Sequence, residues 1–155
     1  ALLAASRQAA STTAELGALS VNEQVEALEL SAADPLAELV APRLIASTLT
    51  LPLLTVIGTF MSTASAVLTL TYFFQVDGTT FMDPALVDAG DILCAVTKSV
   101  VCGAFIPIAA SLRGLRAKGG ASAVGEAVTT GVVEACMGCL LLDFLVAAVF
   151  LIVGV

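Results

Sequence analysis

Three long apolar stretches, separated by short polar segments, organise the chain. The first runs from about 44 to 74 and carries no charged residue. The second covers about 92–112, and the third covers about 127–153. Because a helix rises about 1.5 Å per residue, each stretch is long enough to cross a hydrocarbon core of about 30 Å. The pattern predicts an all-α, polytopic membrane fold with about three spans in this chain.

Particular residues predict how the spans meet the bilayer. Pro52 predicts a bend in the first span, and Tyr72, Phe73 and Phe74 are typical of an aromatic belt where a helix leaves the membrane. Lys98 lies near the start of the second span, where its long stem can carry the ammonium group to the head groups.

A shorter amphipathic pattern precedes the spans. Ser20 and Glu23 have the S-x-x-E spacing of a capping box, which predicts the start of a helix covering 20–30. Apolar positions recur at helical spacing on one face of this helix, at Val21, Val25 and Leu28. Acidic residues occupy its other faces.

The sequence around Asp34 and Pro35 predicts a second helix start, with Asp34 as the capping residue and Pro35 in the first helical position. We therefore divide the chain into membrane-proximal helices over 1–42 and a transmembrane region over 43–155.

Charged residues predict the orientation of the spans. A short loop after the second span holds three of the six basic residues, which by the positive-inside rule places it on the cytoplasmic side. Arg43 then lies on the same side, and the acidic segment 75–91 lies opposite. The adjacent glycines Gly119 and Gly120 in this loop predict a tight turn. The loop residues of interest are Arg113, Arg116, Lys118, Gly119 and Gly120.

Composition excludes several classes of function. Apolar residues make up 59% of the 155 positions and charged residues only 12%, far from a soluble domain. The net charge of −7 argues against nucleic-acid binding. The chain has no His, the commonest general base and metal ligand. We expect no catalytic site, metal or cofactor in this chain.

The four cysteines lie in or beside apolar runs, and we expect free, packed thiols. Cys136 and Cys139 form a C-x-x-C pair, but no second such pair or His accompanies it.

The chain begins with Ala without a signal-peptide pattern, so we expect it to be the carboxyl-terminal part of a longer protein.

Two carboxylates, Glu134 and Asp143, lie inside the third apolar stretch. Nine positions separate them, so on a straight helix they point in nearly opposite directions and need different partners. Ionisable groups inside a membrane mark functional positions by default. The structural alternative places Glu134 at head-group level and pairs Asp143 with a hydroxyl or backbone group.

The order and spacing of the polar motifs resemble those of the MlaE/YrbE permeases of lipid-transporting ABC systems, a family that includes a chloroplast lipid-import permease. The chain resembles the carboxyl-terminal part of that family. The first motifs are AELG at 14–17, VNEQVEAL at 21–28, DP at 34–35 and VAPR at 40–43. The later motifs are KSVVCG at 98–103, GLRAKGG at 114–120, VG at 124–125 and DFL at 143–145.

The resemblance implies a permease subunit that moves phospholipid or glycerolipid between membranes, with ATP and Mg²⁺ bound on a separate ATPase chain. It also implies a second permease copy in a homodimer, a lipid-binding partner of the MCE type, and a plastid inner envelope or bacterial inner membrane. The helix at 20–30 would then be a coupling helix. Carried over by motif, the ATPase-coupling residues are Glu15, Leu16, Gly17, Glu23, Gln24, Ala27 and Leu28.

Two alternatives remain open at this stage. The first is a membrane scaffold or assembly subunit, in which the helix at 20–30 recruits a partner without coupling to ATP. The second is a secondary transporter that uses Glu134 or Asp143 as a proton relay. Lipid species and transport direction are not encoded in any of these patterns.

Overall fold

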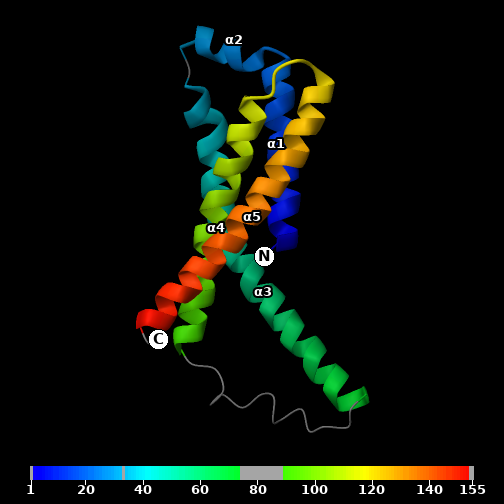
Figure 1. The fold of residues 1–155 in the computed structure, drawn as a ribbon, viewed down its shortest axis with the longest axis vertical. Helices are drawn as coiled ribbons and strands as arrows, with labels where there is room; N and C mark the ends of the chain where they lie inside the picture. Colours follow the sequence, from blue (N-terminus) through cyan, green and yellow to red (C-terminus); the bar gives the residue numbers. More distant parts are fainter. Residues whose placement is uncertain (1, 33, 74–88, 154–155) are drawn as a thin grey trace.

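The computed structural model describes residues 2–32, 34–73 and 89–153, and every regular element in this part of the chain is a helix (Figure 1). A single turn of π-helix, η1, leads directly into α3. The elements are α1 (Leu2–Val21), α2 (Gln24–Leu30), η1 (Leu36–Val40), α3 (Ala41–Phe73), α4 (Ala89–Leu115) and α5 (Ala121–Val153).

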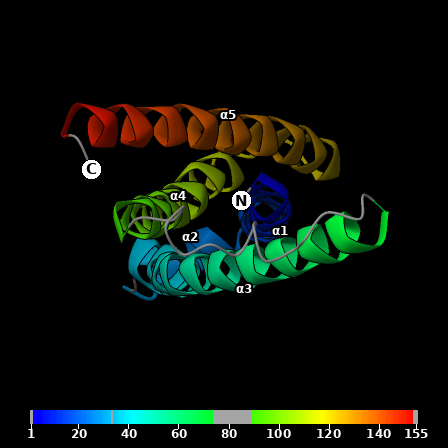
Figure 2. The same ribbon diagram turned by 90° about the horizontal axis from the view of Figure 1, so that it is seen from below.

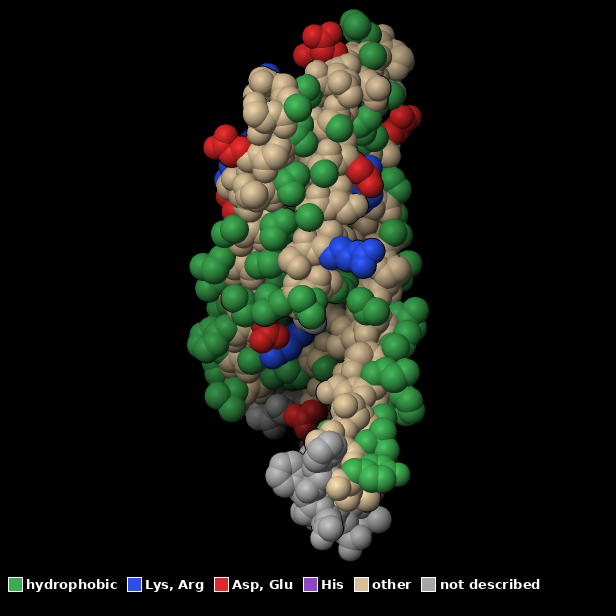
Figure 3. Space-filling model, turned by 90° about the vertical axis from the view of Figure 1, so that its right-hand side faces the viewer, with side chains coloured by type: hydrophobic (Ala, Val, Ile, Leu, Met, Phe, Trp, Pro, Cys, Tyr) green, Lys and Arg blue, Asp and Glu red, His purple; other side chains and the backbone are tan. Residues whose placement is uncertain are grey.

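The prediction of three spans is confirmed, because three stretches of helix are long and apolar enough to cross a membrane. Each span begins before its expected boundary, since the helical backbone continues past the apolar core into charged positions such as Arg43 and Glu126. Hydrophobic side chains cover much of the face in Figure 3, with charged groups at only a few points. The spans are Leu36–Tyr72, Gly90–Leu115 and Ala121–Ile152.

Helix α1 is part of the bundle and packs along both α4 and α5 (Figures 1 and 2). Ala5, Ala9 and Leu16 line its buried face and expose at most 1% of their surface. These side chains are spaced three, four or seven positions apart, as one helical stripe requires. The first helix of the segment 1–42 therefore shares a core with α4 and α5.

Small residues let α1 approach its neighbours closely. A Cβ atom on Gly114 of α4 would lie 2.8 Å from the Leu16 Cβ and 3.0 Å from the Thr13 carbonyl oxygen. A Cβ on Gly131 of α5 would lie 2.8 Å from the Thr13 hydroxyl oxygen. Thr13 donates that hydroxyl to the Ala110 carbonyl at 3.2 Å. The three helices thus meet around one buried threonine.

Helix α3 contacts α4 along its first half. Ser47 is buried and donates its hydroxyl to the Gly103 carbonyl at 2.7 Å. A Cβ on Gly103 would lie 3.0 Å from the Ser47 carbonyl oxygen, so the two backbones nearly touch. Pro52 lies inside α3, and the later part of this helix diverges from α4 and α5 (Figure 1).

The expected capping box at Ser20 is wrong. Ser20 belongs to the last turn of α1, and its hydroxyl donates to the carbonyls of Leu115 and Ala117, each at 3.2 Å. The end of α4 leaves unpaired carbonyl groups, which take this hydroxyl. The chain turns at Glu23, whose φ is 58°, and α2 begins at the next residue.

The capping role of Asp34 is confirmed. Its Oδ1 atom accepts a hydrogen bond from the Leu36 N–H at 3.0 Å, and its carbonyl accepts one from the Glu38 N–H at 3.1 Å.

At the other end of the first span, Tyr72 is exposed, as an aromatic belt requires. Phe74 and the acidic segment up to residue 88 lie outside the described residues.

Candidate functional site

Helix α2 forms a small acidic surface at one end of the bundle (Figure 1). Glu23, Gln24 and Ala27 are exposed, whereas Val25 and Leu28 are half-buried on the opposite side. The amphipathic character expected for this segment is therefore confirmed, although the helix spans Gln24–Leu30 and is shorter than 20–30. Its outward face offers a carboxylate and an amide to a partner.

The remaining residues carried over as ATPase-coupling residues lie on α1 and differ from one another. Glu15 is exposed and forms an ion pair with Arg43 of α3 at 2.8 Å. Leu16 is fully buried, and a Cβ on Gly17 would lie 3.1 Å from Val124 of α5. Leu16 and Gly17 therefore hold the bundle together, and only Glu15 presents a side chain at the surface.

The basic loop confirms one prediction and corrects another. Gly119 and Gly120 adopt φ values of 113° and 96°, which glycine reaches at little cost, so the tight turn is confirmed. Arg116 and Lys118 are exposed. Arg113, however, lies within α4, because the helix continues beyond the apolar stretch to Leu115.

Arg113 binds Glu134 of α5. Its Nε donates to Oε2 at 2.6 Å, and its Nη2 donates to Oε1. Glu134 therefore has a specific cation of the neighbouring helix as its partner. A bidentate pair of this kind fixes the relative orientation of its two helices as well as their charge balance.

Asp143 binds Lys98 of α4, with 3.1 Å between the Lys98 Nζ and Asp143 Oδ1 atoms. The structural alternative for Asp143 is corrected, since its partner is a cation and not a hydroxyl or backbone group. The pair borders a cavity of about 570 Å³, whose apolar lining includes Leu51, Ile106 and Leu140.

The two ion pairs explain how carboxylates nine positions apart coexist on one helix. Glu134 and Asp143 each bind a different cation, as expected, but both cations belong to α4, so both carboxylates reach the same neighbouring helix. A proton relay needs a carboxylate that can alternate between partners, whereas each of these carboxylates is bound to a cation of α4. The arrangement favours a structural function for both pairs.

The cysteines are free. Cys102 and Cys139 are buried, and the Cys102 thiol lies 3.9 Å from the Cys139 carbonyl oxygen across the α4–α5 contact. Cys136 is only half-buried, so the C-x-x-C pair splits between two environments. These thiols pack the helices together, as their apolar surroundings predicted.

Several contributing residues were missed because their signals are weak in sequence. Thr13 and Ser47 were each part of a small-residue or hydroxyl-rich stretch, and Ser20 was assigned to a capping box. Nothing in their local sequence identifies a carbonyl partner 56 to 97 positions away. Arg7 on α1 was also passed over, although it lines a cleft between α1 and α3.

Comparison with known proteins identifies the family. The Permease MlaE family model matches residues 1–149. The chain is 35% identical over 151 residues to the chloroplastic protein trigalactosyldiacylglycerol 1 of Arabidopsis thaliana, covering 96% of this chain and 43% of that protein. It is 33% identical to a probable ABC transporter permease protein of Synechocystis, covering 93% and 56% of the two chains.

A probable ABC transporter permease protein of Rickettsia prowazekii is 31% identical, with 96% of this chain and 58% of that protein covered. The chain thus spans about half the length of the curated relatives it matches. Its three spans make it an integral membrane protein. With the polar motifs in the expected order and a family match over nearly all its residues, the chain belongs to the MlaE permease family.

Proposed function

We propose that this chain is the membrane-spanning part of a permease subunit in an ABC-type transporter that moves a glycerolipid between membranes. The family match and the probable ABC transporter permeases among the relatives support the transporter class. The Arabidopsis relative carries the name of a galactolipid built on diacylglycerol, which supports a glycerolipid as cargo. ATP hydrolysis takes place on a separate ATPase chain that binds Mg²⁺ and the nucleotide.

The observation that carries the proposal is the exposed acidic face of α2 at one end of the bundle. Glu23, in the turn before α2, and Gln24, the first residue of α2, belong to the EQ motif and are exposed, and the helix is too short to cross a membrane. An acidic surface beside a basic loop avoids anionic lipid and suits a protein partner. The ATPase docks on this face, at the cytoplasmic end of the spans.

The contacts around α2 provide a route from the ATPase to the spans. The chain turns at Glu23 directly from α1, whose Ser20 holds the end of α4. On the other side, Glu15 and Arg43 join α1 to α3. Movement of α2 therefore displaces two connected helices, and coupling follows when α2 contacts the ATPase differently in two states.

The family pattern adds two further partners to the proposal. A second copy of the permease completes the transport path as a homodimer, and a lipid-binding protein of the MCE type exchanges cargo on the opposite side of the membrane.

The test is copurification of the full-length permease with its ATPase in mild detergent. Glu23→Lys reverses the charge of the docking face, and we expect it to abolish ATPase recovery. Glu126→Lys is the matched control, because Glu126 is also exposed but lies in the first turns of α5. Equal ATPase recovery from both variants would refute α2 as the docking site, and recovery of membrane partners without any ATPase would favour a scaffold.

A further inference from the structure

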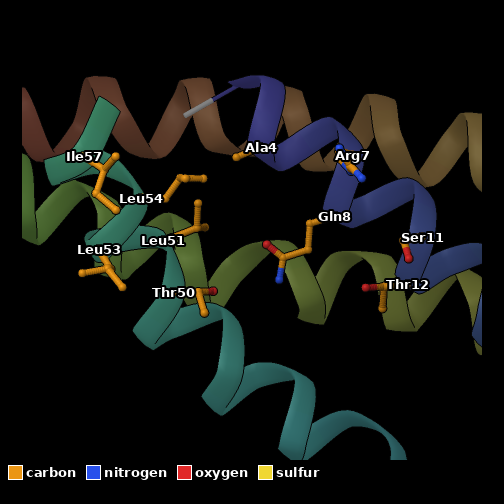
Figure 4. A pocket seen from close by; sticks show the side chains of 10 residues that line it. All are labelled: Ala4, Arg7, Gln8, Ser11, Thr12, Thr50, Leu51, Leu53, Leu54 and Ile57. Atoms are coloured by element: carbon orange, nitrogen blue, oxygen red, sulfur yellow. The ribbon is translucent and has the colours of Figure 1, made fainter. Parts of the chain in front are cut away.

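A cleft of about 500 Å³ separates α1 from α3, within the usual range of about 300–1,000 Å³ for small-molecule sites. Its two walls differ in chemistry. Helix α1 contributes polar side chains, including Arg7, Gln8 and Ser11, whereas α3 contributes mainly Leu53, Leu54 and Ile57 (Figure 4). The cleft is therefore amphipathic, with a cation on one wall and branched aliphatic groups on the other.

The cleft lies between α1 and the first membrane span, and Arg7 is exposed on its α1 wall. Arg7 precedes Glu15 by eight positions on α1, which places it about 12 Å along the helix axis from the Glu15–Arg43 pair. The opposite wall, around Leu54, belongs to the first span. A guanidinium group beside an apolar span is costly in lipid unless an anion or water satisfies it.

Arg7 differs from the three basic residues that lie within the spans. Arg43, Lys98 and Arg113 each bind a carboxylate. Within residues 2–32, 34–73 and 89–153, no carboxylate lies within salt-bridge distance of Arg7. The cleft therefore carries a net positive charge, even though the whole chain has a net charge of −7.

We infer that the α1–α3 cleft is a binding site for the phosphate group of a phospholipid, held by Arg7. A guanidinium group matches a phosphate with two parallel hydrogen bonds. Gln8, Ser11 and Thr50 add donors beside it, and the aliphatic wall of α3 accepts the first part of the acyl chains. The ligand's glycerolipid class rests on the proposed function, whereas the phosphate is specified by Arg7.

The test places a photoreactive p-benzoyl-phenylalanine at Leu54 of the full-length permease, in nanodiscs containing phosphatidylglycerol and neutral monogalactosyldiacylglycerol. A matched probe replaces Leu49, which is 70% exposed on α3 and does not line the cleft. Mass spectrometry identifies the captured lipid. We expect the Leu54 probe to favour phosphatidylglycerol by about tenfold, as loss of a charge-assisted contact implies, and the Leu49 probe to show no preference.

Arg7→Gln removes the preference at Leu54, whereas Arg7→Lys keeps part of it because the charge remains. An unchanged preference in Arg7→Gln would overturn the inference. So would displacement of the captured lipid by excess inorganic phosphate, which identifies a free-anion site, or crosslinking of the Leu54 probe to a protein segment that fills the cleft. The experiment uses neither ATP nor the ATPase, so its result is separable from ATPase docking.

Discussion

Arg113 and Glu134 join α4 to α5 through two hydrogen bonds, although 21 positions separate them in the sequence. Lys98 and Asp143 form a second ion pair between the same antiparallel helices. Both cations belong to α4 and both carboxylates to α5. The pairs therefore set the register of two membrane spans that small and thiol side chains hold in contact.

The Arg113–Glu134 pair provides the first prediction. Arg113→Glu and Glu134→Arg each place like charges opposite one another, so each single variant lowers the thermal unfolding midpoint of the purified full-length permease. Combining them restores an attractive pair and recovers most of the loss. Arg116→Glu, in the exposed loop, is the control for the added carboxylate. Additive losses in the double variant would show that the pair does not bind in the native bundle.

The Lys98–Asp143 pair distinguishes a structural function from a proton relay. Asp143→Asn leaves the Lys98 ammonium beside an apolar cavity without a counter-charge, and we expect reduced thermal stability. Replacing both residues, with Lys98→Met and Asp143→Leu, removes the unpaired charge and restores stability and ATP-dependent lipid transfer. A stable double variant that binds and stimulates the ATPase but moves no lipid would support the relay.

Gly114 of α4 and Gly125 of α5 are two helical glycines whose surroundings differ. Gly114→Ala drives a Cβ into Leu16 and the Thr13 carbonyl, so we expect a destabilisation of about 1–3 kcal/mol. At Gly125 nothing lies within 4 Å of the added Cβ, and Gly125→Ala stabilises the helix by up to about 1 kcal/mol. Reversible unfolding in mixed micelles measures both. Equal effects would contradict the close approach of α1 to α4.

Ser20 secures the junction between α1 and the end of α4. Ser20→Ala leaves two carbonyl groups without this donor, and we expect a loss of about 1 kcal/mol of unfolding free energy. Hydrogen exchange near Leu115 should increase in the same variant. Ser122→Ala, at an exposed position in the first turn of α5, is the control and should leave both measurements unchanged.

Hydrophobic patterning predicted the membrane spans because a helix that faces lipid must be apolar over a fixed length, which is a local property. The capping function of Asp34 was equally local and is confirmed. The capping box at Ser20 failed because its hydroxyl has two possible kinds of partner, and the packing of α1 against α4 selects the distant carbonyls.

The candidate site was only partly predictable for a similar reason. Helix geometry predicted separate partners for Glu134 and Asp143, but it did not predict that both partners lie on α4, because that depends on the register between α4 and α5. Leu16 was carried over by motif as a coupling residue, and its complete burial appears only when α1 enters the bundle. Arg7 gains significance from the cleft that α3 forms with it, which no single segment encodes.

The most direct measurement is transfer of a fluorescent glycerolipid by the full-length permease, reconstituted in proteoliposomes with its ATPase and lipid-binding partner. We expect transfer to require ATP in the native protein and in Glu126→Lys, and to stop in Glu23→Lys while that variant remains folded. Continued ATP-dependent transfer in Glu23→Lys, or equal transfer without the ATPase, would contradict a permease driven through α2.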